Sequence, residues 1–136
     1  MRQAAILSGL ALLAACGSAA AAGREQRTAP TGTWGGDHVL LEVTAGGAAL
    51  ELDCAHGTVE GPIRLDGEGR FDVGGTFVQE RGGPVREGQE NARPARYAGR
   101  VEGQTMTLTI AVGDGGDTLG PFELVRGRGP RLTKCL

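Results

Sequence analysis

Apolar and polar side chains alternate along most of the chain from Thr31 onward. Alternation with period two is typical of β-strands that have one buried face. In the stretch HVLLEVTAGGAALELDC we expect a two-residue turn at Gly46-Gly47. That turn sets Val43 opposite Leu50 and Leu41 opposite Leu52. The pattern therefore predicts a hairpin with one apolar face.

Further turns extend this hairpin into a meander. We expect a turn at His56-Gly57, another over residues 66–70, and a tight turn at Gly103-Gln104. The second of these sets Gly61 opposite Gly75, and the third sets Tyr97 opposite Ile110. Leu119 is out of step with Phe122 and Leu124, which indicates a bulge at Gly120-Pro121. A last strand is expected to end at Cys135.

This reading predicts an all-β domain over residues 31–136, with eight short strands and seven connections. An open meander has two exposed edges, and closure removes them. We therefore expect a small eight-stranded up-and-down antiparallel barrel, with a two-sheet β-sandwich as the alternative. The interior of an eight-stranded barrel has space for side chains or for one small ligand.

The N-terminal region reads as an export signal. Residues 4–15 form an apolar run after Met1 and Arg2, and the run is too short to span a bilayer. It ends in Leu13-Ala14-Ala15-Cys16, which resembles the bacterial lipobox. We expect residues 1–15 to be a lipoprotein signal peptide, Cys16 to carry the lipid, and residues 16–30 to be a flexible tether. Cleavage after residues 20–22 is the alternative.

The cysteine count agrees with lipidation. The chain has three cysteines, and an odd number in an exported protein needs an explanation. If Cys16 carries lipid, Cys54 and Cys135 remain, and the oxidising compartment favours a disulfide between them.

Composition and charge narrow the function only slightly. Gly accounts for 25 of 136 residues, and the net charge of −2 gives no basic field for nucleic acid. The tail carries Arg126, Arg128, Arg131 and Lys134 without an acid, and we expect it to lie beside the acidic first strands.

Gly32-Thr33-Trp34, placed just before the first expected strand, resembles the Gly-X-Trp opening of lipocalins and avidins, the calycin-type barrels. Residues 99–110 are similar to an avidin-like hairpin, and the whole chain resembles small secreted bacterial proteins. The resemblance implies that Trp34 closes the barrel base beneath an arginine near the C-terminus: Arg126, Arg128 or Arg131. No second tryptophan is present, so the resemblance implies no avidin-type biotin site.

The candidate sites follow from this plan. Trp34 is expected to be a plug, with an indole filling the space left by Gly61, Gly75 and Gly99. Extending the first hairpin places Asp37 opposite His56, with His38 nearby, as a candidate rim site for acid–base chemistry or a metal. A simple turn contact is the favoured interpretation of this pair. No metal or other cofactor is expected.

Residues 79–96 form the one long connection that we expect. Long connections in compact domains are often functional. Arginines recognise carboxylates and phosphates, and this segment contains four of them as candidate binding residues: Arg81, Arg86, Arg93 and Arg96. A solvated, self-neutralising loop is the alternative.

Taken together, these features predict a non-enzymatic lipoprotein of the bacterial cell envelope, at the outer membrane or cell surface. It would be a binding module for an envelope protein or a small ligand, held to the membrane through its lipid. An inhibitor of an envelope hydrolase, such as a protease or lysozyme, presenting residues 79–96 is the alternative. An enzyme that uses Asp37 and His56 is the third hypothesis.

Overall fold

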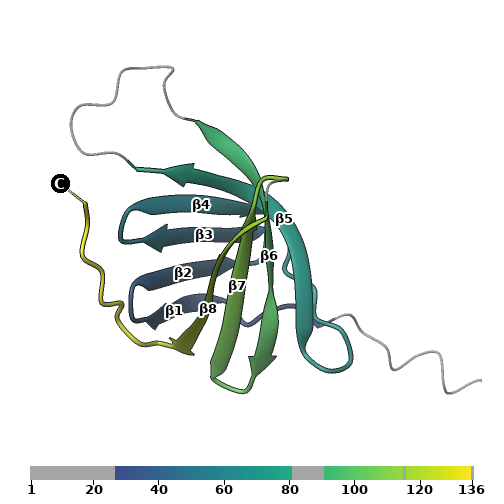
Figure 1. Ribbon diagram of the computed structural model, residues 1–136. Helices are drawn as coiled ribbons and strands as arrows, with labels where there is room; N and C mark the ends of the chain where they lie inside the picture. The colour runs from purple at the N-terminus through teal and green to yellow at the C-terminus, as the bar shows by residue number, and fades with distance from the viewer. Residues whose placement is uncertain (1–26, 81–90, 115, 136) are drawn as a thin grey trace, which may run out of the picture.

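Eight antiparallel strands form a closed barrel in which each strand pairs with its neighbours in sequence and β8 returns to β1 (Figure 1). The computed structural model describes residues 27–80, 91–114 and 116–135. The predicted all-β, eight-stranded antiparallel barrel is confirmed. The strands are β1 (Gly32–Gly36), β2 (Val39–Thr44), β3 (Gly47–Leu52), β4 (Ala55–Glu60), β5 (Arg70–Gln79), β6 (Ala92–Glu102), β7 (Thr105–Val112) and β8 (Asp117–Arg126).

The set of eight strands differs from the expected set at both ends. Trp34 lies within β1, whereas the sequence placed it before the first strand. The expected final strand ending at Cys135 does not form, because the chain after β8 makes only an isolated bridge at Arg131. The barrel therefore closes between the strand that contains Trp34 and the strand that ends at Arg126, and not through a strand ending at Cys135.

The register of the later hairpin is confirmed. Tyr97 lies opposite Ile110 and Val101 opposite Met106, around the predicted turn at Gly103-Gln104. Gly103 has φ +58°, a left-handed conformation that glycine adopts without steric cost. Between β7 and β8 the register shifts so that Leu108 faces Phe122 and Ile110 faces Leu119, which is the predicted bulge.

The registers of the earlier hairpins are wrong. Leu41 faces Leu50 rather than Leu52, and the turn is one residue earlier, at Ala45-Gly46. The next turn is at Asp53-Cys54, which places His56 and Gly57 inside β4. In each of these hairpins the pairing partner of a residue is displaced by an even number of positions. The side chains that face inward are therefore the ones that the alternation predicts.

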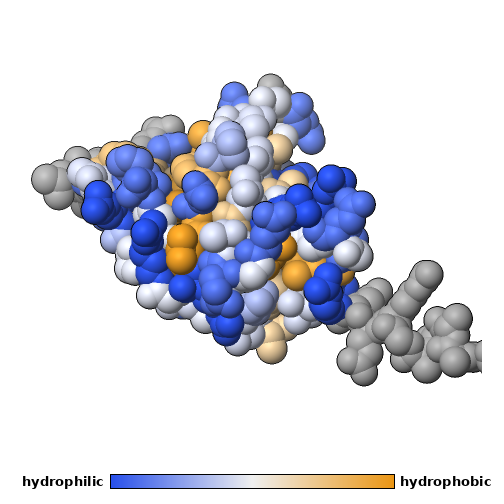
Figure 2. Space-filling view, turned by 90° about the horizontal axis from the view of Figure 1, so that it is seen from below, coloured by the Kyte–Doolittle hydropathy of each residue, from blue (hydrophilic) through white to orange (hydrophobic). Residues whose placement is uncertain are grey.

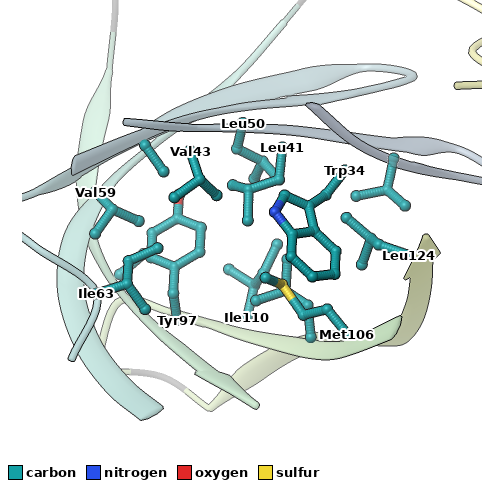
Figure 3. Packing of buried hydrophobic residues seen from close by; sticks show 14 of the residues in the cluster. Trp34, Leu41, Val43, Leu50, Val59, Ile63, Tyr97, Met106, Ile110 and Leu124 are labelled. Atoms are coloured by element: carbon teal, nitrogen blue, oxygen red, sulfur yellow. The ribbon is translucent and has the colours of Figure 1, made fainter. Parts of the chain in front are cut away.

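The barrel interior is filled by the protein's own apolar side chains (Figure 3). Trp34 extends from β1 toward Met106 and Leu124, and the Tyr97 ring occupies the other part of the same view. The described residues include no buried polar or charged residue. The largest side chains with less than 2% exposure are Trp34, Tyr97, Leu41, Leu50, Met106, Leu108, Ile110, Leu124 and Val39.

Of the three glycines predicted to make room for the indole, Gly75 lies against Tyr97 and Gly99 against Phe71, while a Cβ atom on Gly61 would have no neighbour within 4 Å. Gly75 lies opposite Val59, not opposite Gly61 as predicted. A Cβ atom on Gly75 would lie 2.9 Å from Cε2 of Tyr97, and one on Gly57 would touch the Tyr97 hydroxyl oxygen. That hydroxyl donates a hydrogen bond of 2.5 Å to the carbonyl oxygen of Thr76. The interior of the barrel is therefore fitted around a tyrosine.

Because Tyr97 is the only tyrosine, its ionisation can be followed alone. Desolvation by burial raises the pKa of Tyr97 to about 12. A folded-state pKa above the unfolded value near 10 means that this group stabilises the barrel below pH 10. That contribution is lost as the pH rises toward 12. We expect absorbance at 295 nm to titrate near pH 12 in the folded protein and near pH 10 in urea. Equal midpoints would contradict the buried position.

The two ends of the described chain lie at opposite ends of the barrel (Figure 1). At one end, the amide of Ala29 donates to the carbonyl of Ile63 at 2.8 Å, and Thr28 bridges Arg64. The last four residues of the predicted tether, 27–30, therefore belong to the folded domain. Within the described ranges, no helix is long and apolar enough to cross a membrane.

The C-terminal residues 127–135, called the strap below, cross the other end of the barrel. β1 and β8 pair at only two positions, Trp34 with Arg126 and Gly35 with Val125. The chain then turns and continues beside β1, where Arg131 forms a parallel bridge with Asp37. The strap therefore extends the short seam that closes the barrel.

Candidate functional site

The candidate site is the barrel end that the strap crosses, called the strapped rim below. Two tight turns form it: Asp37-His38 joins β1 to β2, and Asp53-Cys54 joins β3 to β4. The end of β5 lies beside them, because the amide of Glu80 donates to the carbonyl of Cys54 at 2.9 Å. The rim thus brings together residues from the start, middle and end of the chain.

His38 occupies the second position of its turn with φ +68°. Left-handed backbone is uncommon outside glycine, and histidine is among the residues enriched there. The amide of His38 donates to the carbonyl of Arg131 at 2.8 Å, and its Nδ1 lies 2.6 Å from Oδ2 of Asp53. His38 therefore contacts the strap through its backbone and the next turn through its ring.

Asp53 links the turn to the strap. Its Oδ1 accepts a hydrogen bond of 2.8 Å from the amide of Thr133, and its carbonyl accepts one of 3.1 Å from Cys135. The amide of Thr133 is the main cause that lowers the pKa of Asp53, and His38 and Lys134 lower it further against desolvation. A carboxylate with these partners stays ionised at neutral pH.

A second carboxylate is held in a similar way. Oε1 of Glu80 lies 3.0 Å from Nδ1 of His56, and its Oε2 lies 3.3 Å from Nζ of Lys134. Desolvation raises the pKa of Glu80, but hydrogen bonds from His56 and Lys134 outweigh it and leave the pKa below its ordinary value. Nζ of Lys134 also donates to the carbonyl of Leu52 at 2.9 Å. Each histidine of the rim is thus paired with one carboxylate.

The prediction that Asp37 faces His56 is wrong. His56 lies within β4 opposite Glu51, because the turn falls at Asp53-Cys54. Asp37 instead lies 4.0 Å from Nε of Arg131, with both side chains more than three-quarters exposed. An exposed pair at this distance contributes little stability. The rim therefore carries two His–carboxylate pairs, neither of which is the predicted one.

The disulfide between Cys54 and Cys135 is confirmed, with 5.2 Å between the two Cα atoms. It joins the β3–β4 turn to the end of the strap. The basic tail was expected beside the acidic first strands: Arg131 does lie next to Asp37, between β1 and β2, but Lys134 lies next to Glu80, after β5. A nucleophilic thiol at Cys54 is not available while the disulfide is intact.

The long connection is shorter than predicted at its C-terminal end, since β6 begins at Ala92. Arg93 lies on β6, 3.8 Å from a carboxylate oxygen of Asp117, and Arg96 lies 2.8 Å from Asp72. These two arginines are strand residues with acidic partners. Arg81 and Arg86 lie outside the described residues.

Of the three arginines proposed to cover Trp34, Arg126 is the one opposite it in the β1–β8 pairing. Its Nε and Nη2 donate to the carbonyl of Thr31 at 3.0 and 2.7 Å. The indole nitrogen of Trp34 donates to the carbonyl of Pro30 at 3.0 Å. The side chains of Trp34 and Arg126 thus fix the segment that directly precedes β1. Cys16 lies outside the described residues.

Both histidines of the rim are partly exposed and already have a carboxylate partner. Their side chains are 40% and 65% exposed. Among the described residues, no group of three or more His, Cys, Asp or Glu side chains is arranged to hold a metal ion. Sequence reasoning missed Glu80, Thr133 and Lys134, although pairing Cys54 with Cys135 already implied that Lys134 lies near the β3–β4 turn.

The strap should loosen in acid. Asp53 and Glu80 have folded-state pKa values below their ordinary values of 3.8 and 4.5, so both stabilise the fold above those values. That stabilisation is lost as the pH falls through the lower folded values. We expect melting temperature to change little between pH 7 and 5 and to fall below about pH 4. The double variant Asp53→Asn, Glu80→Gln should flatten the acid limb, whereas Glu60→Gln, on an exposed part of β4, should not.

The chain as a whole matches no protein-family model, no curated protein and no solved structure.

Proposed function

We propose that this protein is a non-enzymatic, lipid-anchored protein of the bacterial cell envelope whose barrel is an interaction module that binds through its outside. The filled interior is the observation that supports binding through the outside of the barrel. Trp34 and Tyr97, the two largest side chains inside, are each no more than 1% exposed. An eight-stranded barrel that carries a ligand needs free space where these side chains lie.

The position of the tether favours the strapped rim as the contact surface. The anchor would enter through residues 27–30, which pair with residues 63–65 at the opposite end of the barrel. Lipidation of Cys16 would place that end toward the membrane and the rim away from it. The side of the barrel seen in Figure 2 is mostly hydrophilic, with small hydrophobic areas between hydrophilic residues. Such a surface suits a polar, reversible contact.

The calycin-type resemblance supports this proposal at the level of architecture. Gly32-Thr33-Trp34 opens the barrel, and Arg126 lies opposite Trp34 at the seam. We propose that the chain is a calycin-like barrel in which the lumen is closed. The membrane through its lipid, and an envelope protein at the rim, are the partners that this arrangement suits.

Site-specific photocrosslinking of the full-length lipoprotein in cells would test the contact surface. A photoreactive amino acid at Asp37, on the rim, should give crosslinks to an envelope protein. The same residue at Gly46, in the exposed β2–β3 turn, should not, because the carbonyl of Gly46 accepts from the amide of Gly61 beside the segment that pairs with residues 27–30. Crosslinks from Gly46 alone would contradict the proposal. Cys16→Ser should abolish lipid labelling, and unchanged labelling would contradict the anchor.

An inhibitor of an envelope hydrolase is the second candidate. β5 and β6 are long strands that pair up to Val78 and Ala92, so they hold both ends of the connection between them. Inhibitory loops are commonly displayed from such rigid scaffolds. Replacing residues 83–90 with a short Gly-Ser link should alter the free energy of unfolding by less than about 1 kcal/mol. Retention of crosslinking at Asp37 in this variant would exclude the loop as the contact surface.

A further inference from the structure

The strap is held by polar contacts and one covalent bond. Each of its nine residues is at least partly exposed, and none belongs to the buried core. Burial of apolar surface therefore contributes little to keeping it in place. The disulfide is the one strong restraint on its far end.

Hydrogen bonds hold the strap along its length. The amide of Gly127 donates to the carbonyl of Thr33 at 2.6 Å, and the Arg131 backbone exchanges bonds of 2.8 and 3.1 Å with His38 and Gly36. The amides of Thr133 and Cys135 donate to Asp53, and Nζ of Lys134 donates to the carbonyl of Leu52 at 2.9 Å. A hydrogen bond at an exposed position adds little net stability, because water competes for both partners. Fixing the backbone of nine residues opposes these gains. Without the disulfide, the open strap should be favoured over the closed one.

The disulfide itself is positioned for exchange with an external thiol. Cys135 is exposed and Cys54 only half-buried, at the tip of a two-residue turn. Exposed disulfides are the ones that exchange readily, whereas buried ones wait for the protein to unfold. Both sulfur atoms lie outside the barrel interior, so their separation requires no core residue to move.

From these observations we propose that the Cys54–Cys135 disulfide is a redox latch: its reduction by an external dithiol releases the strap from the rim while the barrel stays folded. One thiolate of the dithiol attacks a protein sulfur and breaks the protein S–S bond. Its second thiol then resolves the mixed disulfide. Cys54 and Cys135 become thiols by gaining two electrons and two protons, and the dithiol becomes a disulfide.

The structure shows where the strap would pivot and which surface it would uncover on opening. The chain reverses at Gly127, which has φ +82°, and Arg128 donates from its amide to the carbonyl of Val125 at 3.2 Å. The strap then lies against Gly35, where a Cβ atom would be 3.1 Å from the carbonyl carbon of Gly129. Opening would uncover Gly35 and remove Arg131 and Lys134 from their carboxylate partners. The rim would thereby become more acidic.

The barrel is expected to survive because the strap adds nothing to its interior. Trp34 stays paired with Arg126, which precedes the strap, and its neighbours Met106 and Leu124 belong to β7 and β8. This inference goes beyond the proposed function, since it concerns the covalent state of the rim and holds whether or not the rim binds a partner.

The test uses the full chain carrying Cys16→Ser, which leaves only the two latch cysteines, with hydrogen exchange followed by mass spectrometry. After dithiothreitol is added, we expect peptides containing His38 and residues 131–135 to exchange at least about tenfold faster, as for local opening. Peptides from β5–β7 should change by less than about twofold. The variant with Cys135→Ser in addition should show the open pattern without reductant.

The rate of reduction provides a second measurement. For an accessible disulfide the rate should rise in proportion to dithiothreitol concentration under native conditions. A rate that is independent of dithiothreitol and equal to the rate of global unfolding would overturn the proposal. So would a strap that stays protected after reduction, or a barrel that loses protection together with the strap.

Discussion

Replacing Trp34 with alanine should cost about 3–5 kcal/mol of the free energy of unfolding, the range for deleting a fully buried large aromatic side chain. Trp34 is completely buried, and its ring lies among Leu41, Met106 and Leu124 in Figure 3. The variant also loses the hydrogen bond from the indole nitrogen to Pro30. Since small domains have about 5–15 kcal/mol in total, much of the stability would be lost.

Urea denaturation followed by far-ultraviolet circular dichroism would measure this loss without relying on tryptophan fluorescence. Thr107→Ala is the matched control, because Thr107 is an exposed β7 residue next to buried Met106 and Leu108. The control should stay within about 0.5 kcal/mol of the parent. A loss below about 1 kcal/mol for Trp34→Ala would contradict the role of Trp34 as an internal plug.

Gly75→Ala should cost about 1–3 kcal/mol or more through overpacking. The added Cβ would lie 2.9 Å from Cε2 of Tyr97 and would collide with the carbonyl oxygen of Thr58. Backbone cannot yield as a flexible side chain does, so the strand itself must shift. Gly74→Ala is the control, because the only neighbour of its Cβ within 4 Å would be an Arg96 nitrogen at 3.8 Å.

Chemical denaturation of the two alanine variants should separate them clearly. The contribution of the tyrosine can be isolated with Tyr97→Leu, which removes the ring edge that the new Cβ would meet. Gly75→Ala should then cost less in the Tyr97→Leu background than in the parent, as the coupling in a double-mutant cycle. Equal costs for Gly74→Ala and Gly75→Ala would contradict the described fit between the glycine and the ring.

The alternation of side chains predicted which residues face inward but not how the early strands align. A slip of one residue would turn apolar side chains outward, whereas a slip of two keeps every one of them inside. Pairing Leu41 with Leu50 or with Leu52 satisfies the same pattern, so the register of β2 and β3 needed information about the turn. Adjacent Gly46 and Gly47 permitted either placement.

The β6–β7 hairpin was predictable because its turn was unambiguous. Gly103 is the only glycine between Val101 and Met106, and it takes the left-handed conformation that the turn needs. Once that turn is placed, the alternation on both sides admits one alignment. The contrast with the first hairpin shows that a single well-placed glycine constrains register better than a pair.

The strapped rim was largely hidden from sequence reasoning. Asp53 meets Thr133, and Glu80 meets Lys134, across more than fifty residues of chain and without any shared periodicity. The strap has no repeating pattern of its own, since it follows the surface instead of joining the sheet. The cysteine count pointed to this region because it required a partner for Cys54, and the basic charge of the tail pointed the same way, but neither identified the carboxylates that the strap contacts.

The disulfide also decides how the protein would respond to tension. A pull between residue 27 and the C-terminus follows the covalent chain through residues 27–54 and then crosses from Cys54 to Cys135. The chain from β4 to β8 forms a closed loop outside that path, so it is shielded from the applied force. Full extension of the exposed path is limited to about 100 Å, at about 3.6 Å per residue. With the disulfide intact, a protein pulled from these two ends would therefore yield by a short, fixed length while most of its strands bear no tension.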